Sequence, residues 1–478
     1  MESIETVSTR HPLPAAVIIG RHGFKPPTTV IEDDRMRDFD PQNDALDFYE
    51  QFEGMRVQIN KPVVVGPTSR FGEFVVLADN GKDASVRSKR GGIILRKNDP
   101  NPERIFVSTS IAAETPSVNV GDRFDGAIVG VLDYTFGNFK LMASGQFPVI
   151  KPANLKPEKT NLEGGKDRLT VATYNVENLD FLDPDTRFQN VARSIVENLA
   201  SPDIIGLQEI QDNDGAKNDG IVDAAKTFTR LIDAIQKADG PVYDFCQTNP
   251  VNNTDGGQPG GNIRVGFLFN PKRVHFEKRN ENADSTQVQF HDDGPFLTVN
   301  PGRVAFHRQA FKHSRKPLIA EFTFNGQKVF VINNHLNSKG GDNSLFGSVQ
   351  PPIRKSEVKR TAQAQIVHDF VRDLLIKAPE AKVIVLGDMN EHEFRKPMKI
   401  LGGSLMDDLT GYIKPEERYT FIYNGNSQVL DHIFANTYFI KMASPEIDIV
   451  HINSEYNNAE RASDHDPQVA RFRISAHR

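Results

Sequence analysis

The pattern of apolar and polar positions divides the chain into distinct parts. Residues 1–50 carry prolines followed by acidic residues, which predicts an extended arm. Residues 51–150 consist of short alternating apolar runs, such as Phe74–Leu77 and Gly92–Leu95, separated by turn dipeptides such as Asn80-Gly81. Many short alternating runs are typical of a small all-β barrel or sandwich. We therefore expect an all-β domain at 51–150, with an OB-like barrel as one candidate.

The pattern changes again after residues 151–168, a polar stretch with several prolines that we predict to be a linker. In residues 169–478, strand-like apolar runs alternate with segments that repeat apolar residues every three or four positions. These segments predict helices at Asp185–Leu199, Ile221–Lys237 and Ser356–Lys377. On the last helix, the positions expected to face the core are Val358, Ala362, Ile366, Phe370 and Leu374.

The dipeptide Asn325-Gly326 lies between two apolar runs, Leu318–Phe324 and Lys328–Leu336. Asn-Gly supplies the positive backbone angles of a two-residue hairpin turn, so the two runs are predicted to be antiparallel strands. Antiparallel strands mixed with strand–helix alternation predict two packed sheets with helices outside. The expected fold class is α+β, in which a two-sheet α/β sandwich follows the small all-β domain.

Composition narrows the classes of protein that fit. The net charge of −6 means that a polyanionic ligand would have to meet a local basic patch rather than the overall field. The single cysteine, Cys246, excludes an intramolecular disulfide and is predicted to be a small buried residue in a strand. No stretch reaches the ~18–20 apolar residues of a membrane span, and residues 1–14 show no apolar core of a signal peptide.

Polar groups follow the predicted strands of the second half. Each has a structural explanation on its own, because amides brace turns and buried histidines occur in ordinary cores. Together they indicate one site, since strand ends that share an edge of a sheet present their side chains to a common crevice. The set comprises Asn175, Glu209, His335, Asp388, Asn390, Asp431, Asp464 and His465.

The residue types in this set indicate the chemistry. Carboxylates and amides without cysteine suit a hard divalent cation such as Mg²⁺ or Mn²⁺. Two histidines suit proton transfer near neutral pH. The sequence has no Gly-x-Ser-x-Gly motif and Cys246 is isolated, so hydrolysis by an activated water is favoured over a covalent nucleophile. A metal beside a phosphate would neutralise the charge that develops during such a reaction.

Two motifs carry a resemblance to a known family. The run Ser-Asp-His-Asp-Pro at 463–467 and the run Gly-Asp-Met-Asn at 387–390 resemble the endonuclease/exonuclease/phosphatase superfamily, the group of DNase I. The likeness covers about residues 169–473 and implies a Mg²⁺-dependent nuclease. It implies that Glu209 binds the catalytic metal, with Asn175 and Asp464 near it.

The same resemblance assigns the remaining positions. Asp388 and Asn390 are expected to hold and polarise the scissile phosphate or the attacking water. His335 and His465 are expected to be the acid–base pair that brackets the phosphate, with Asp431 orienting His465. Nucleic acid, with DNA ahead of RNA, is the implied partner, and little sequence preference is expected.

Further local runs look like bacterial extracellular nucleases that carry an N-terminal β domain. These runs contain Arg264, Arg315 and Lys339, which we expect to contact phosphate, although a solvated basic side chain is the alternative. The basic residues at 354–360 are expected on a solvated helix face. The resemblance suggests an extracellular protein and a chain that begins upstream of Met1; an intact native N-terminus at Met1 in mass spectrometry would contradict the latter.

Other functions fit the same residues. A phosphatase or phosphodiesterase acting on an inositol phosphate or a phospholipid headgroup would use the same metal site. A nucleic-acid-binding protein without turnover is the alternative from another class. The Asp- and Asn-rich loop Asn280–Arg303 is either a structural Ca²⁺ site or a polar loop.

Overall fold

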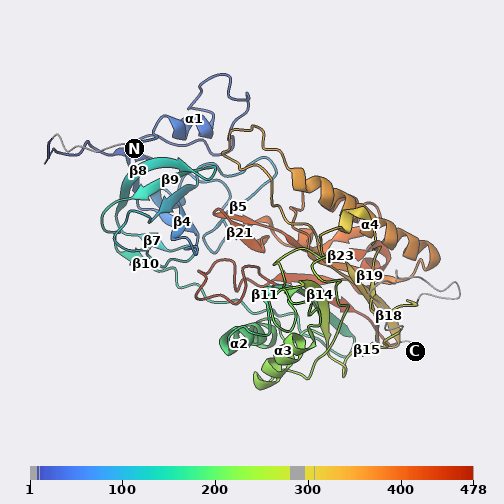
Figure 1. Cartoon of the computed structure of the whole chain (residues 1–478). Coiled ribbons are helices and arrows are strands. Elements are labelled where there is room, and N and C mark those ends of the chain that lie inside the picture. The colour runs from blue at the N-terminus through green and yellow to red at the C-terminus, as the bar shows by residue number, and fades with distance from the viewer. Residues whose placement is uncertain (1–7, 10, 280–295, 306, 477–478) are drawn as a thin grey trace. The chain divides into compact units, whose positions relative to one another are not determined.

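The computed structural model describes residues 8–476, apart from residues 10, 280–295 and 306. The chain forms two compact units, each made from more than one stretch of sequence (Figure 1). The N-terminal unit comprises Met1–Ser85, Asn98–Asn154 and Ser344–Pro352, and the C-terminal unit comprises Val86–Lys97, Leu155–Asn343 and Ile353–Arg478. The predicted boundaries treated each domain as one continuous stretch, whereas each unit takes in a short segment from within the sequence of the other.

The N-terminal unit is built on a nine-stranded sheet with the strand order β1-β2-β8-β9-β6-β4-β3-β7-β10. Along β8, buried Ile128, Gly130 and Leu132 alternate with more exposed residues, as the two-residue period of a strand requires. The all-β prediction is confirmed, and the OB-like topology stays a prediction. The elements are β1 (Val17–Ile19), α1 (Ala45–Glu50), β2 (Arg56–Asn60), β3 (Val63–Gly66), β4 (Glu73–Leu77), β6 (Ile105–Ser108), β7 (Arg123–Phe124), β8 (Ala127–Thr135), β9 (Asn138–Ala143) and β10 (Ile150–Lys151).

The C-terminal unit contains two large sheets. The first has the order β13-β14-β12-β11-β25-β24, and the second has the order β15-β17-β18-β19-β23-β20, with β16 paired to β17. The first sheet consists of β11 (Arg168–Leu179), β12 (Ile204–Ile210), β13 (Asp244–Gln247), β14 (Arg264–Phe269), β24 (Glu446–Ile449) and β25 (Gln468–Arg473). The second consists of β15 (His275–Phe276), β16 (Gly302–Arg303), β17 (Leu318–Phe324), β18 (Gln327–His335), β19 (Lys382–Asp388), β20 (Met406–Asp408) and β23 (Asp431–Asn436).

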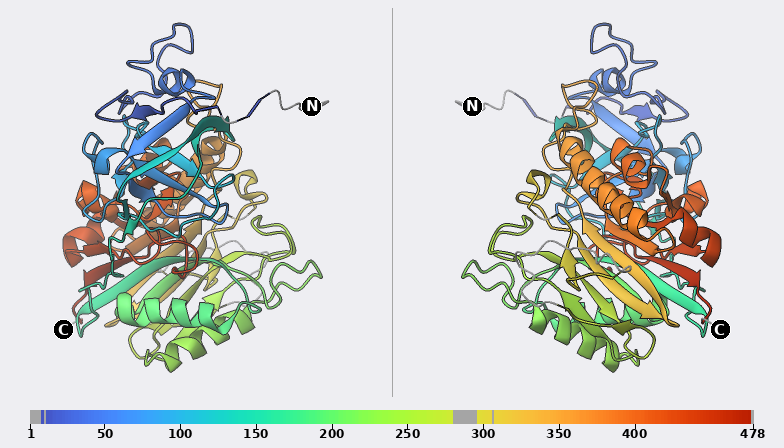
Figure 2. Two further views of the ribbon diagram at one scale, coloured as in Figure 1. Left: turned by 90° about the vertical axis from the view of Figure 1, so that its left-hand side faces the viewer. Right: turned by 90° about the vertical axis from the view of Figure 1, so that its right-hand side faces the viewer.

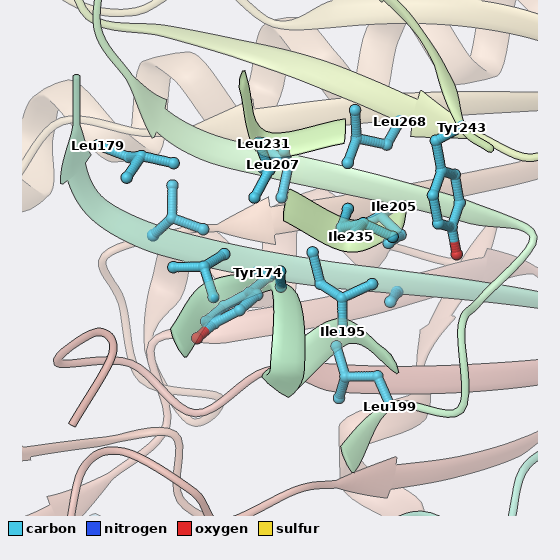
Figure 3. Packing of buried hydrophobic residues seen from close by; sticks show 14 of the residues in the cluster. Tyr174, Leu179, Ile195, Leu199, Ile205, Leu207, Leu231, Ile235, Tyr243 and Leu268 are labelled. Atoms are coloured by element: carbon cyan, nitrogen blue, oxygen red, sulfur yellow. The ribbon is translucent and has the colours of Figure 1, made fainter. Parts of the chain in front are cut away.

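Helices cover the outer faces of this sandwich. The main ones are α2 (Asp185–Arg193), α3 (Ala225–Lys237), α4 (Lys355–Lys377) and α5 (Lys396–Gly402), whereas α6 (Thr437–Ala443) adds Phe439 and Ala443 to the apolar layer between the sheets. Between the sheets, the rings of Phe267 and Phe322 meet edge to face with centroids 5.7 Å apart. The outer face of the first sheet packs against α2 and α3, as Leu207 and Ile235 illustrate (Figure 3).

The second sheet packs against α4 and α5 through a further apolar layer, and the right-hand view of Figure 2 shows α4, in orange, lying along its strands. The hairpin prediction is confirmed, because β17 and β18 are antiparallel around Asn325-Gly326. The fold class predicted for residues 169–478, two sheets with helices outside, is therefore confirmed. Cys246 is buried in β13 as a free thiol. None of the helices in the described part of the chain has the length and apolar character needed to cross a membrane.

The predicted core-facing side of α4 is wrong at the N-terminal end of the helix and correct further along, where Ile366 and Phe370 pack against the apolar layer. Val358 is 74% exposed and Ala362 is also exposed, whereas Arg360 and Gln363 are fully buried beside Leu374. Hydrophobic periodicity cannot assign a face whose buried positions are polar. The side chains of Arg360 and Gln363 bind loops next to the cluster described below, which explains why polar residues occupy the covered face.

The run Gly92–Leu95 was expected in the all-β domain, and that placement is wrong. Its strand β5 (Ile93–Ile94) belongs to the C-terminal unit, where it pairs with β22 (Asn426–Gln428) in parallel. The third strand of this small sheet is β21 (Phe421–Tyr423). A two-residue strand has no periodicity that would reveal its partner, so only the tertiary structure places it.

Candidate active site

Three neighbouring strands of the second sheet bring polar side chains together. Strands β18 and β19 are parallel with His335 opposite Asp388, and β19 and β23 are antiparallel with Asp388 opposite Asp431. Paired residues on adjacent strands lie roughly 5 Å apart, so the register alone gathers these three side chains. In the first sheet, the parallel pair β11 and β12 sets Asn175 beside Gln208, one residue before Glu209.

Side chains of the two sheets meet in one cluster. His335 Nε2 lies 3.4 Å from Asp388 Oδ2 and 3.8 Å from Glu209 Oε1. Asn175 Nδ2 donates to Glu209 Oε1 at 3.1 Å and to Asp388 Oδ2 at 3.2 Å. One ligand atom each from Glu209, His335 and Asp388 lies within 4.8 Å of the others. The structure thus brings together four residues that are widely separated in the sequence.

His465 reaches the same cluster from the loop before β25. Its Nδ1 lies 2.7 Å from Asp431 Oδ2, which leaves Nε2 4.0 Å from Asp388 Oδ2 and 4.0 Å from Asp464 Oδ1. The hydroxyl of Ser463 donates to a backbone carbonyl of β11 at 2.6 Å and so anchors this loop to the first sheet. Asp431 therefore fixes which nitrogen of His465 faces the cluster.

Two site residues hold a left-handed backbone. Glu209 has φ +66° and Asn390 has φ +50°. The register of β12 against β14 shifts between Leu207 and Ile210, so Glu209 sits in an irregularity of its strand. Such a conformation costs a non-glycine residue roughly 1–3 kcal/mol and is typical of functional sites. At Glu209 this conformation interrupts the alternation of side chains along β12 and directs the carboxylate toward the cluster.

Asn390 fixes the orientation of Asp388. Its backbone N–H donates to Asp388 Oδ1 at 2.8 Å, and its Nδ2 donates to Asp388 Oδ2 at 3.3 Å. The same Nδ2 donates to the carbonyl of Leu336 at 3.1 Å, which ties the loop after β19 to the loop after β18. The Asp388 carboxylate is thereby locked in one rotamer.

Burial and neighbouring charges push the two histidines apart in proton affinity. Burial, together with the Arg315 cation, lowers the pKa of His335 well below its ordinary value. Burial also acts to lower the pKa of His465, but the Asp431 and Asp464 carboxylates outweigh it and raise that pKa well above its ordinary value. Burial therefore favours the neutral form of His335, and the two carboxylates favour the protonated form of His465.

A family model described as Endonuclease/Exonuclease/phosphatase family matches residues 172–465, which is more than half of the chain. The chain belongs to this family. The motif-based resemblance is confirmed, and because nucleases and phosphatases alike hydrolyse phosphoester bonds, the C-terminal unit is a phosphoester hydrolase of the endonuclease/exonuclease/phosphatase type. A second model, described as Domain of unknown function (DUF8508), matches residues 18–152.

A search of solved structures matches truncated Caenorhabditis elegans TDP2, at 19% identity and a TM-score of 0.40 over 66% of this chain and 100% of that one. The human Nocturnin catalytic domain with bound sulfate is 16% identical, with a TM-score of 0.43 over 65% of this chain and 96% of that one. An endonuclease/exonuclease/phosphatase from Bacteroides vulgatus is 15% identical, with a TM-score of 0.38 over 64% of this chain and 99% of that one. No match was found among curated proteins.

The donor atoms of the cluster fit a hard divalent cation. Glu209, Asp388 and Asp464 offer carboxylate oxygens, which are the ligands that Mg²⁺ and Mn²⁺ prefer. Asn175 presents its amide nitrogen to two of these carboxylates, while its Oδ1 accepts the N–H of Glu177 at 3.0 Å. Ligation through that oxygen would require the amide to turn. The roles of Asn175, Glu209 and Asp464 as metal ligands stay predictions.

Two of the three predicted phosphate contacts border the cluster. Arg315 is buried, donates to the carbonyl of Leu336 at 2.6 Å, and acts electrostatically on the neighbouring histidine. Lys339 Nζ donates to Oε1 of Glu391 at 2.9 Å, and Glu391 is the residue that directly follows the Gly-Asp-Met-Asn motif. Arg264 is 2% exposed and donates to polar groups of β13 and the adjoining loop, so among described residues it does not contact the cluster.

Sequence reasoning missed a buried ion pair beneath the site loops. Arg360 on α4 and Glu391 are both fully buried, with Nη2 2.9 Å from Oε2. Arg360 Nη1 also donates to the carbonyls of Asn337 and Ser338 in the loop after β18. The basic run that contains Arg360 was expected on a solvated face, which is wrong for this residue. The available signal was the position of Glu391, directly after Asn390.

A second missed feature joins the two sheets below the cluster. Gln208 Nε2 donates to Asn333 Oδ1 at 2.7 Å, and Asn333 Nδ2 donates to the carbonyls of Leu207 and Gly266 at 3.0 and 2.9 Å. All of these groups are buried, so their hydrogen bonds are satisfied inside the sandwich. A Cβ on Gly206 would lie 2.4 Å from a methyl group of the facing sheet, so the sheets approach very closely here.

Proposed function

We propose that this hydrolase is a divalent-metal-dependent phosphodiesterase that cleaves nucleic acid, DNA first and RNA second, with little sequence preference. The observation that carries the proposal is the cluster in which Glu209, His335 and Asp388 meet within 4.8 Å, and in which Asp388, Asp431 and His465 do the same. Nucleic acid is preferred as the substrate because the local runs around the site resemble extracellular nucleases.

The residues of the cluster provide the proton transfers of hydrolysis. When water attacks phosphorus, an O–P bond forms and the ester P–O bond breaks, so one proton leaves the water and one joins the departing oxygen. His335, held neutral by burial, is suited to accept a proton at Nε2. His465 is suited to donate a proton from Nε2, because Asp431 binds the Nδ1 side of the ring and, with Asp464, raises the pKa of His465 so that the ring is doubly protonated. Asp388, locked by Asn390, orients the water or the phosphate between them.

A divalent ion held by Glu209, with Asn175 and Asp464 beside it, would supply charge neutralisation at the phosphoryl oxygens. Arg315 and Lys339 are suited to position the phosphate from the rim, since both are basic and lie against the loop after β18. Burial of the cluster strengthens each of these electrostatic interactions.

Cleavage of supercoiled plasmid and end-labelled linear DNA tests the proposal, with Mg²⁺, Mn²⁺ and Ca²⁺ varied and with EDTA added. We expect His335→Ala and His465→Ala each to reduce kcat roughly 10²–10⁴-fold. His275→Ala, at an exposed histidine of β15, is the matched control and should leave cleavage unchanged. Cleavage that survives both EDTA and the two active-site substitutions would contradict the proposal.

The same preparation separates the other candidate functions. Turnover of sphingomyelin or inositol phosphates at a higher kcat/KM than DNA would assign the site to a small phosphoester. Binding of DNA with no turnover in Mg²⁺ or Mn²⁺ would assign the chain to a non-catalytic nucleic-acid-binding protein.

A further inference from the structure

A second group of carboxylates lies in the N-terminal unit. Residues 1–50 were expected to be an extended arm with an acidic stretch at 32–40 and a short helical turn at 44–52. The turn is confirmed as α1, whereas the acidic stretch is not extended, because the segment before it folds back on the start of α1. The backbone N–H groups of Ala45 and Leu46 donate to the carbonyls of Val30 and Ile31 at 3.3 and 3.0 Å. This fold concentrates the acidic side chains of the segment, which are Glu32, Asp33, Asp34, Asp38, Asp40, Asp44 and Asp47.

Three of these side chains converge. Glu32, Asp34 and Asp44 each place a carboxylate oxygen within 4.8 Å of the other two. The backbone N–H groups of Arg37 and Asp38 both donate to the Asp34 carboxylate at 2.8 Å, so its position is fixed. Glu32 Oε1 accepts the N–H of Asp34 at 2.8 Å. The geometry of the group is therefore set by the backbone rather than by solvent.

Two oxygens of this group are buried without a partner. Asp44 is 2% exposed, and its Oδ1 has no hydrogen-bond donor. Oε2 of Glu32 is likewise buried and has none. A buried carboxylate oxygen without a donor or a counter-charge is strongly unfavourable, and the mutual repulsion of three carboxylates adds to this cost. A cation between the three side chains would remove both penalties at once.

We propose that Glu32, Asp34 and Asp44 form a divalent cation site of the Ca²⁺ type, separate from the catalytic cluster. Each of the three side chains offers oxygen, which is the ligand that Ca²⁺ requires. Ca²⁺ binds six to eight oxygens at about 2.3–2.6 Å in flexible geometry, so two of its ligands span up to about 5 Å. The irregular loop between Glu32 and Asp44 suits this tolerance, whereas Mg²⁺ demands a near-ideal octahedron.

Such an ion would hold the folded-back segment against the helix. Glu32 and Asp34 lie at one end of the loop, and Asp44 directly precedes α1 (Ala45–Glu50). The neighbouring residues Ile31, Ala45, Leu46 and Phe48 are buried in the apolar core of the N-terminal unit. Binding would therefore couple Ca²⁺ concentration to the stability of this unit.

The test compares the full-length protein with four variants by equilibrium dialysis against ⁴⁵Ca²⁺ and by thermal unfolding. Asp44→Asn and Glu32→Gln remove a ligand charge in the group. Asp38→Asn is the matched control, because its carboxylate is exposed and it makes the same charge change in the same loop. Glu209→Gln reports any ion that binds at the catalytic cluster instead.

We expect Asp44→Asn and Glu32→Gln each to lose one bound Ca²⁺ that Asp38→Asn and Glu209→Gln retain. At a Ca²⁺ concentration about 100 times Kd, the Tm of the parent protein should rise by roughly 5 °C or more, and this rise should vanish in the two ligand variants. The same number of bound ions and the same rise in Tm in all variants would overturn the proposal. A site filled by Mg²⁺ at equal concentration would overturn the assignment to Ca²⁺.

Discussion

At the residue scale, Asp431 is the partner that orients His465, the histidine for which we propose a role in proton transfer. Its carboxylate binds Nδ1 of His465 at 2.7 Å, which selects Nε2 as the nitrogen that faces Asp388. A carboxylate in this position holds the imidazole in one tautomer and one orientation, as in other sites where a histidine transfers protons. Loss of the Asp431 carboxylate should lower kcat more than it changes KM, because His465 would be misoriented while the rest of the site stays in place.

We predict that Asp431→Asn lowers kcat by about 10²-fold or more and changes KM little. An amide cannot stabilise the imidazolium and can bind the ring in the wrong tautomer. Asp407→Asn, at an exposed position of the adjacent strand β20, should keep full activity. Steady-state cleavage of a labelled oligonucleotide measures both parameters, and an Asp431→Asn enzyme with the parent kcat would argue against the acid–base assignment.

The neighbouring residue His432 serves stability instead. Its Nδ1 lies 2.7 Å from Asp408 Oδ2, and its Nε2 lies 2.9 Å from the carbonyl of Glu391. Both nitrogens face acceptors, which favours the doubly protonated ring. Burial acts to lower the pKa of His432, but the Asp408 carboxylate outweighs it and raises that pKa to about 9.

We predict that the free energy of unfolding falls as pH rises from about 6.5 to about 9, where His432 loses its proton. A raised pKa means that the folded state keeps the proton longer, so the contribution is complete below about pH 6.5 and lost as pH passes about 9. The loss should be roughly 1–3 kcal/mol, since neutral His432 can still donate one hydrogen bond. Urea denaturation at several pH values measures it. Asp408→Asn should flatten the dependence and Asp407→Asn should not.

At the scale of elements, α4 shows what sequence patterns can and cannot predict. The helix itself and the hairpin around Asn325-Gly326 follow from periodicity and turn chemistry, and both are confirmed. The N-terminal part of the buried face of α4 was mispredicted because Arg360 and Gln363 occupy it, whereas the prediction of Leu374 is confirmed. Their partners are loop carbonyls and Glu391, and no local pattern encodes a contact with a distant loop.

Some site residues could likewise be predicted from the sequence, and other features of the site could not. His335, Asp388 and His465 stand out by type and position after apolar runs, so the sequence predicts them, and the structure places them in one cluster. The left-handed backbone of Glu209 was not predictable, because no glycine or turn dipeptide marks it. The bridge of Gln208 to Asn333 was also missed, since buried amides resemble surface amides in a sequence.

We predict that Glu391→Gln destabilises the protein by up to roughly 3–5 kcal/mol, because the buried Arg360 cation loses its close counter-charge and keeps only the Asp342 carboxylate, 3.8 Å away. Activity should fall as well, since Glu391 also holds Lys339 and follows Asn390 in the same loop. The double variant Arg360→Met with Glu391→Leu should recover much of the stability but not the activity. Denaturant unfolding and DNA cleavage separate the two effects, and Asp373→Asn, exposed on α4, is the control.

At the scale of the whole molecule, each compact unit depends on a segment from a remote part of the chain. Phe346, in the segment Ser344–Pro352, is 5% exposed within the core of the N-terminal unit. Its ring lies 5.9 Å from that of Tyr49, and its carbonyl accepts the hydroxyl of Tyr134 at 2.7 Å. The C-terminal unit in turn includes the segment Val86–Lys97, in which Nε of Arg90 lies 2.6 Å from Oε2 of the buried residue Glu455.

We predict that Phe346→Ala costs the N-terminal unit about 3–5 kcal/mol, as expected for a buried phenylalanine. Phe136→Ala is the matched control, because Phe136 is 91% exposed in the same unit and should be neutral. Limited proteolysis followed by peptide mapping reports the stability of each unit separately. Cleavage of the N-terminal unit that is no faster in Phe346→Ala than in Phe136→Ala would contradict the role of the segment.

The exchanged segments also set an order of events during synthesis. A ribosome makes a chain from its N-terminal side toward its C-terminal side, and domains usually fold as soon as their own sequence has emerged. Here the N-terminal unit lacks Phe346 until the segment Ser344–Pro352 has been translated. Its strands must therefore wait, incompletely packed, while most of the hydrolase sequence is added behind them.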